Sequence, residues 1–261
     1  MNFAALVEYD GTRFAGFQRQ PPEKGPTVQG AIEAAIARIA GATIPIEAAG
    51  RTDSGVHATG QVINFTAPDR LSEADWHRAL NALLPADVAI RAMCQVDDAF
   101  RARWRALARS YRYRLFAKAV RAPLRERYAW RTPKALDVGA MCAAAALLVG
   151  EHDFGAFGSS PRDQRATGIR GHTVRTMLAA TCRQSELAPD EVECDFTANA
   201  FLSGMVRRLV GTIARVGDGR LSLADFQHVL ESRDKALAAP AAPACGLYLV
   251  GVTYPAGMVS W

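Results

Sequence analysis

One stretch of this 261-residue chain, residues 50–64, combines the residue types that chemistry needs and reads GRTDSGVHATGQVIN. Asp53 lies between Arg51 and His57, and glycines on both sides allow the backbone to turn sharply and approach a ligand closely. Arg51 favours the charged form of the carboxylate, because a nearby cation stabilises it. We therefore expect Asp53 to be an ionised, partly buried aspartate on a turn, able to serve as nucleophile, general base or metal ligand.

Two other interpretations of Asp53 compete with a catalytic one. In a solvated turn, Asp53 and Ser54 would only hydrogen-bond their own backbone. The triplet Asp53-Ser54-Gly55 also fits the D-[ST]-G signature of aspartic proteases, which need two aspartates that share a proton. The chain has no second D-[ST]-G triplet, so the protease interpretation is disfavoured.

The composition is that of an ordinary globular protein, with 49% hydrophobic residues. No run approaches the roughly 18 apolar residues that a membrane span requires. The chain opens with MNFAALVEYD, which has no basic leader region, long apolar segment or cleavage site. We therefore expect a cytoplasmic protein with no membrane partner.

The cysteines are odd in number and scattered, and none forms a C-x-x-C pair. This pattern argues against a disulfide framework and against a zinc site, so no metal is expected. We expect the thiols to be reduced and mostly buried. The five residues are Cys94, Cys142, Cys182, Cys194 and Cys245.

Positive charge is concentrated in residues 100–131, although the net charge of the whole chain is only +5. Glu126 is the single acid there. Arginines mixed with aromatic rings are typical of RNA recognition, since phosphates meet the charges and unstacked bases meet the rings. A strand with one solvated face is the alternative. The basic residues are Arg101, Arg103, Arg105, Arg109, Arg112, Arg114, Lys118, Arg121, Arg125, Arg127 and Arg131, and the aromatic ones are Trp104, Tyr111, Tyr113, Phe116, Tyr128 and Trp130.

The first hundred residues predict the element order β-α-β-β-α-β, the split βαβ pattern. Thr27 and Ser72 are candidate helix caps, each followed by apolar residues at helical spacing. Apolar runs or alternation predict strands over residues 3–9, 44–49, 61–66 and 88–96.

The second half repeats this order. It predicts strands at 111–115, 174–182, 192–196 and 247–254, helices at 136–149 and from Leu202 to Ile213, and a further helix capped by Ser222. Residues 159–171 predict an exposed basic loop. We expect an α+β fold of two ferredoxin-like halves, with antiparallel sheets joined around a central basic cleft and helices on one side. The expected domains are residues 1–102, which carry Asp53, and 103–261, which complete the cleft.

The motif GRTDSGVHA at residues 50–58 resembles the active-site motif of the TruA family of tRNA pseudouridine synthases. Further segments fit the same family in order along nearly the whole chain. They are YDGT at 9–12, F-x-G-F-Q-x-Q at 14–20, TVQG at 27–30, F-x-A-R at 100–103, R-x-Y-x-Y at 109–113, NAFL at 199–202, MVR at 205–207 and GLYL at 246–249.

The resemblance implies that the C1′–N1 bond of a uridine is broken, the base is rotated, and the base is rejoined through C5. It implies no cofactor and no metal. The family's essential aspartate corresponds to Asp53. Its carboxylate would either attack the sugar or base, or remove a sugar proton to give a glycal-like intermediate, and the sequence does not choose between them. His57 lies inside the motif and is interpreted as structural.

Five further residues match positions with family roles. Tyr111 would stack on the target base, Arg207 would pair with the catalytic aspartate, and Arg51 would help to extrude the uridine. Arg103 would contact the RNA backbone, and Leu247 would wall the base pocket. Each also has a plain structural interpretation, as a core aromatic or leucine or as a surface arginine.

The resemblance further implies a homodimer that binds one tRNA and acts at uridines 38, 39 and 40 of the anticodon arm, with no DNA partner. The alternative is a non-catalytic RNA-binding or chaperone protein of the same fold, which would not explain Arg51, Asp53 and Arg207 together. One departure from the family is Ser203-Gly204 ahead of the methionine. A glycine inside a helix there would cost on the order of 1 kcal/mol.

Overall fold

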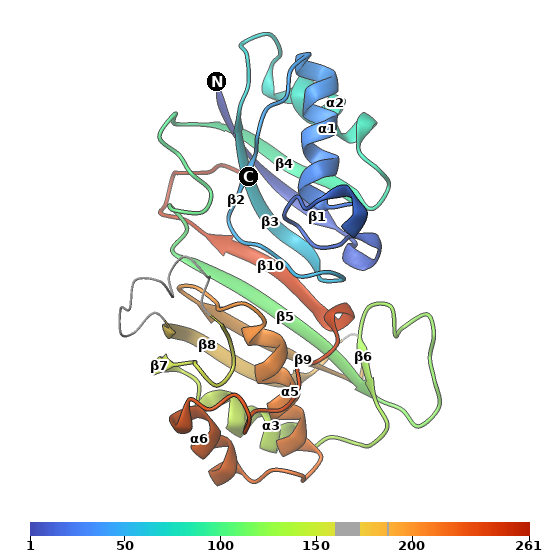
Figure 1. Cartoon of the computed structure of the whole chain (residues 1–261), viewed down its shortest axis with the longest axis vertical. Helices are drawn as coiled ribbons and strands as arrows, with labels where there is room; N and C mark the ends of the chain where they lie inside the picture. The colour runs from blue at the N-terminus through green and yellow to red at the C-terminus, as the bar shows by residue number, and fades with distance from the viewer. Residues whose placement is uncertain (160–172, 187) are drawn as a thin grey trace. The chain divides into compact units, whose positions relative to one another are not determined.

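A computed structural model describes residues 1–159, 173–186 and 188–261 of the chain (Figure 1). The chain forms two compact units, which we call unit 1 (Met1–Arg109 with Tyr248–Trp261) and unit 2 (Ser110–Leu247). These units differ from the expected domains because residues 103–109 and the end of the chain belong with the first half. The predicted α+β class is confirmed. The predicted basic loop at 159–171 lies outside the described residues apart from Ser159.

Unit 1 has the predicted order β-α-β-β-α-β. Its sheet runs β4-β1-β3-β10, β2 also pairs with β3, and only the β3–β10 pairing is parallel. β2 is shorter than expected, because only two residues pair with β3. The elements are β1 (Asn2–Tyr9), α1 (Val28–Ala40), β2 (Glu47–Ala48), β3 (His57–Thr66), α2 (Glu73–Leu83), β4 (Val88–Val96) and β10 (Leu247–Thr253), with 3-10 turns at Gly11–Arg13 and Pro22–Lys24.

The two helices of unit 1 begin at the predicted caps. Thr27 Oγ1 accepts from the amide of Gly30, and Ser72 Oγ accepts from the amide of Asp75, so each satisfies a helix-terminal donor. Trp76 of α2 packs against Phe3 and Phe65 with ring centroids 6.4 Å and 5.6 Å away. This aromatic cluster fixes α2 on one face of the sheet.

The opposite face of the unit 1 sheet is covered by a turn and by the end of the chain. Ala4, Val62 and Cys94 of the sheet pack there against Phe100 and Ala102. Tyr254 closes the cluster, and its hydroxyl donates to the carbonyl of Ala102 at 2.7 Å. The segment that follows β4 is therefore firmly seated on the sheet.

Unit 2 contains a sheet in the order β5-β9-β8-β7, with the short β6 parallel to β5. The predicted antiparallel pair is confirmed as β8 and β9. β6 and β7 were not predicted, because three or four residues are too few to show a period. The elements are β5 (Ala108–Ala117), β6 (Trp130–Thr132), α3 (Val138–Ala146), β7 (Gly150–Asp153), β8 (Val174–Gln184), β9 (Glu191–Ala198), α5 (Met205–Gly217), α6 (Leu223–Ser232) and the 3-10 turn Ala244–Gly246.

Gly204 lies just before α5 and not inside it. Its φ is 70°, a left-handed conformation that favours glycine, and the helix begins at Met205. Leu202, expected to be helical, precedes this turn. The anticipated cost of a helical glycine therefore does not apply, because this residue makes the entry turn.

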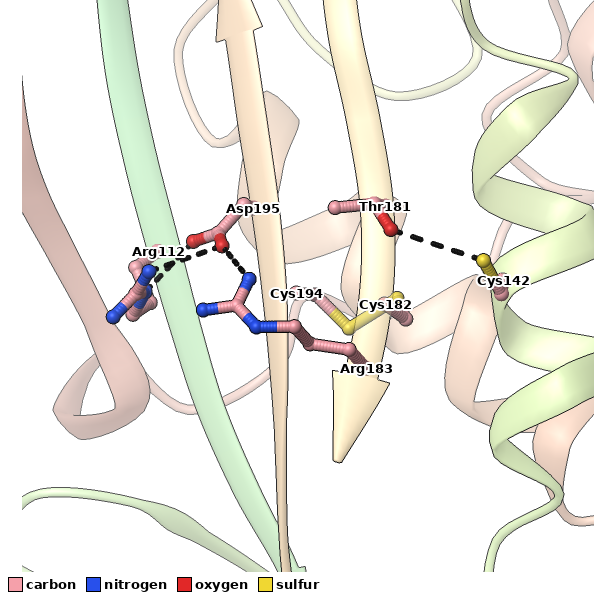
Figure 2. Close-up of a disulfide and its surroundings, with 7 residues drawn as sticks. All are labelled: Arg112, Cys142, Thr181, Cys182, Arg183, Cys194 and Asp195. Atoms are coloured by element: carbon pink, nitrogen blue, oxygen red, sulfur yellow. Dashed lines mark hydrogen bonds and ion pairs between the residues drawn. A yellow bond between two sulfur atoms is a disulfide. The ribbon is translucent and has the colours of Figure 1, made fainter. Parts of the chain in front are cut away.

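The prediction that all cysteines are reduced was wrong for two of them. Cys182 of β8 and Cys194 of β9 form a disulfide (Figure 2). The two residues are directly opposite in the antiparallel ladder, with Cα atoms 4.1 Å apart. Strand register creates this proximity, so cysteine spacing along the sequence does not reveal it. Cys94, Cys142 and Cys245 are free thiols.

Candidate active site

Asp53 lies on the loop between β2 and β3, and its side chain is exposed. The expectation of partial burial was therefore wrong. Thr52 beside it is the buried residue, and its hydroxyl hydrogen-bonds that of Tyr9 at 2.8 Å. With Thr52 anchored inward, the loop presents the carboxylate of Asp53 outward.

The main chain on both sides of Asp53 is held by residues 14–17. The amide of Phe17 donates to the carbonyl of Thr52 at 3.1 Å. On the other side, Ser54 Oγ and the Gly55 amide both donate to the carbonyl of Phe14, at 3.2 Å and 3.4 Å. The N-terminal F-x-G-F segment thus acts as a support for the aspartate loop.

Two glycines of the N-terminal motif permit this close approach. A Cβ on Gly11 would lie 2.0 Å from the carbonyl oxygen of Val56. Gly16 has φ +108°, and a Cβ there would lie 3.0 Å from the carbonyl oxygen of Thr52. Any larger residue at Gly11 would push the two loops apart.

His57 is 2% exposed and supports the fold. Its Nδ1 accepts from the amide of Gly11 at 3.1 Å, and its ring stacks on Tyr248 with centroids 4.8 Å apart. These contacts join β3, β10 and the turn after β1. They agree with the interpretation of His57 as structural.

Arg109 belongs to the basic stretch and to the R-x-Y-x-Y segment, neither of which assigns it a role. Its guanidinium donates to three main-chain carbonyls: Ala49 at 2.9 Å, Arg103 at 2.7 Å and Ala106 at 3.2 Å. It therefore fastens the turn at 103–106 to the residue that leads into the Asp53 loop. Main-chain acceptors have no residue-type signature, so the sequence offers no signal for this role.

Arg51 and Arg103, the other predicted site residues of unit 1, are exposed. Within the parts of the chain that the structure describes, neither arginine has a carboxylate at ion-pair distance. The Arg103 guanidinium lies 5.0 Å from the ring centroid of Trp104. Both arginines are thus available for an anion.

Unit 2 carries the remaining predicted residues. Tyr111 of β5 is 8% exposed, and its ring meets Phe201 edge-on at 5.0 Å. Tyr113, two residues further along β5, is fully buried and donates its hydroxyl proton to the carbonyl of Pro243 at 2.7 Å. Burial raises the pKa of Tyr113 far above its usual range.

Residues 242–247 link Arg207 and Leu247. Arg207 Nε donates to the carbonyl of Ala242 at 2.7 Å, and the Ala242 amide returns a bond to the carbonyl of Arg207 at 2.9 Å. Leu247 is buried at the other end of this segment. A Cβ on Gly246 would meet the Tyr113 ring at 2.7 Å, so this segment also packs tightly against β5.

Several arginines of the basic stretch are paired with acids inside unit 2. Arg112 Nε bonds Asp195 at 2.8 Å, and Arg114 Nε bonds Glu191 at 2.5 Å. Figure 2 shows Arg112 and Arg183 on either side of Asp195. Burial alone would raise the pKa of Asp195, but the bonds from the two guanidiniums outweigh it and lower that pKa. We call this set of pairs the arginine ladder.

Among the residues that the structure describes, no group of three or more His, Cys, Asp or Glu side chains lies close enough together to hold a metal ion. No helix among those residues has both the length and the apolar character needed to cross a bilayer.

Residues 5–104 and 144–255 match the family described as tRNA pseudouridine synthase. This match includes the Asp53 loop, its N-terminal support and the segment with Arg207 and Leu247. The chain belongs to this family. It is therefore an RNA isomerase that converts uridine to pseudouridine, and its substrate is tRNA. The resemblance seen in the sequence motifs is confirmed.

Individual relatives are similar to this chain over nearly its full length. The tRNA pseudouridine synthase A of Neisseria gonorrhoeae (strain ATCC 700825 / FA 1090) is 44% identical over 255 residues, which cover 97% of this chain and 92% of the relative. The enzyme of the same name from Geobacillus kaustophilus is 42% identical over 250 residues, which cover 95% of this chain and 93% of the relative. The tRNA pseudouridine synthase A of Roseiflexus castenholzii is 42% identical over 255 residues, which cover 97% of this chain and 91% of the relative.

Proposed function

We propose that this isomerase forms pseudouridine at positions 38, 39 and 40 of the tRNA anticodon stem-loop, with Asp53 as its essential catalytic residue. One observation carries the role of Asp53: it is an exposed carboxylate on a loop whose main chain is hydrogen-bonded on both sides. Both attack on the uridine and removal of a sugar proton need a carboxylate placed to within a fraction of an ångström. A short side chain on a fixed loop meets that need.

The other site residues have proposed roles that fit their surroundings. Tyr111 stacks on the target base, and Leu247 forms an apolar wall of its pocket. Arg207, whose Nε is fixed by Ala242, pairs with Asp53 and holds its carboxylate. Arg51 helps to extrude the uridine and Arg103 contacts the RNA backbone, and both residues are exposed in unit 1.

We further propose that the enzyme acts as a cytoplasmic homodimer on one tRNA, without a cofactor or a DNA partner. Recognition would then rest on tRNA shape and backbone contacts, which tolerate three adjacent target positions better than a base-reading pocket would. Sedimentation of the enzyme with and without tRNA tests the dimer. A monomeric variant with unchanged tRNA activity would contradict it.

The proposed positions are tested with unmodified tRNA transcripts that carry a single uridine at 38, 39 or 40, and with one that carries none of the three. Carbodiimide mapping should locate product at each single uridine with the wild type. Asp53→Asn should give none while filter binding shows retained tRNA. Asp69→Asn, which removes another exposed carboxylate of unit 1, is the matched control and should behave as the wild type. Product at other uridines only would refute the proposed site.

A further inference from the structure

We propose that Trp104 is a stacking platform for an unpaired base of the substrate RNA, displayed on an arginine-rich turn of unit 1. This inference rests on the proposed function only in taking tRNA as the ligand. Trp104 is 74% exposed, whereas tryptophan side chains are on average largely buried. It matches none of the positions to which the proposed function gives a role.

The Trp104 ring is carried by a well-anchored turn. The amides of Trp104 and Arg105 both donate to the carbonyl of Arg101, at 3.1 Å and 3.0 Å. Phe100 and Ala102 are buried against the sheet. Arg109 binds the carbonyl of Arg103 at one end of the turn. The ring is therefore presented on a fixed backbone, and little conformational entropy is lost when a ligand stacks on it.

The turn that carries the ring is rich in positive charge. The guanidinium of Arg103 lies 5.0 Å from its centroid, within the range of a cation–π interaction. Arg105 follows Trp104 in the chain and Arg101 begins the same turn, and no carboxylate is at ion-pair distance from these three arginines within the residues that the structure describes. Arg101 Nη1 donates only to nearby carbonyls, those of Asp98 at 2.7 Å and Phe100 at 2.8 Å.

There is space for a nucleotide beside this turn. Arg105 lines a surface hollow of about 660 Å³ together with Asp97, Phe100 and Met258. Ligand sites usually fall between about 300 and 1,000 Å³. The Asp97 carboxylate would repel a phosphate, but its Oδ1 accepts from the amide of Ala99 at 2.7 Å. The hollow thus suits a base or ribose, and the arginines suit the flanking phosphates.

RNA fits this surface better than a second copy of the chain does. A symmetric contact through Trp104 would set the arginines of one copy against the same arginines of the other, and like charges repel. An unstacked base offers an aromatic face to the ring, while its phosphates meet the guanidiniums. Charge complementarity therefore selects single-stranded RNA as the occupant.

Fluorescence titration with an unmodified tRNA transcript tests the platform. The other tryptophans are Trp76, which is buried, Trp130, which is half-buried, and Trp261, which is 46% exposed, so the quenching due to Trp104 is the difference between the wild type and Trp104→Phe. The wild type should be quenched by tRNA, and Trp104→Phe should lose most of that quenching while its dissociation constant changes less than about threefold. Trp104→Ala should bind about tenfold more weakly. Leu107→Ala, which trims another exposed apolar side chain near the turn, is the control and should bind normally.

Three results would overturn the platform: unchanged tRNA affinity in Trp104→Ala, an equal loss in Leu107→Ala, or a Trp104→Ala protein whose sedimentation shows a changed oligomeric state. The last result would assign the ring to an interface between copies. Failure of the proposed function is seen separately. A wild type that binds tRNA through Trp104 but forms no pseudouridine at 38–40 would contradict the proposed function and would still support the stacking platform.

Discussion

The two halves of the basic stretch have opposite environments. In unit 1, Arg101, Arg103 and Arg105 are exposed, and within the described chain they meet carbonyls, a ring or solvent rather than carboxylates. In unit 2, most arginines from β5 to β6 are paired with acids. Those pairs join Arg112 to Glu193 and Asp195, Arg114 to Glu191, Arg125 to Asp190 and Glu191, and Arg121 and Arg131 to Glu126.

This difference shows that a count of charges along a sequence does not give the charge that a ligand meets. The acids of β9 lie far along the chain from β5, and sheet pairing brings them beside its arginines. The unit 2 half therefore stabilises the sheet, whereas the unit 1 half is available to RNA. Variants in the two halves should separate stability from tRNA binding.

The largest effect on stability is expected from Arg109→Ala, at the junction of the two halves. The change leaves the carbonyls of Ala49, Arg103 and Ala106 without their donor, and we expect a loss of about 3 kcal/mol in the free energy of unfolding. Urea denaturation measures it. Arg109→Lys should recover only part of the free energy lost in Arg109→Ala, because a lysine cannot bridge several acceptors with a planar fork. An unchanged free energy of unfolding in Arg109→Ala would contradict the role of this side chain in fastening the turn.

A smaller loss is expected when the arginine ladder is cut. Asp195→Asn keeps the side-chain shape but removes the charge that Arg112 and Arg183 share, and should cost about 1–2 kcal/mol at neutral pH. The affinity for tRNA should stay within about twofold. A double-mutant cycle with Arg112→Ala measures the coupling. A large loss of tRNA affinity with unchanged stability would reverse the assignment of this half.

The ladder should also weaken in acid. Because the folded-state pKa of Asp195 lies below its ordinary value, its charged form stabilises the fold above about pH 4. This contribution is lost as the pH falls through the lowered pKa. The difference in unfolding free energy between wild type and Asp195→Asn should therefore shrink below about pH 4, as measured by urea denaturation at a series of pH values. A constant difference down to pH 2 would contradict it.

The smallest effect on stability belongs to the exposed arginines. Arg105→Ala should change the free energy of unfolding by less than about 0.5 kcal/mol. It should weaken tRNA binding a fewfold and lower the slope of log K against log salt by about 0.7, as one phosphate contact is lost. Arg125→Ala in unit 2 is the matched control, with a greater effect on stability and little on the salt slope. Equal slopes of log K against log salt for the two variants would contradict the difference between the two halves of the basic stretch.

The sequence predicted those features whose determinants are local. Thr27, Ser72 and Ser222 cap helices as expected, because a hydroxyl and an amide three residues later are enough to define a cap. Long alternating strands were predicted for the same reason. β2 was overestimated, because its length depends on pairing with two residues of β3.

The candidate site was predicted only in part. Motifs located Asp53, but its exposure follows from the anchoring of Thr52 under Tyr9, a contact across 43 residues. The Cys182–Cys194 bond follows from strand register, and the role of Arg109 from main-chain acceptors. Such long-range and main-chain contacts leave no trace in residue spacing.

The central claim is that Asp53, held by the support at residues 14–17, performs the isomerisation. It is tested most directly by single-turnover release of tritium from tRNA labelled at uridine C5, with enzyme in excess and tRNA binding measured in parallel. We predict that Asp53→Asn binds tRNA within about twofold of the wild type. Its rate of tritium release should be lower by a factor on the order of 10³ or more. Tritium release by Asp53→Asn at the wild-type rate would contradict the claim.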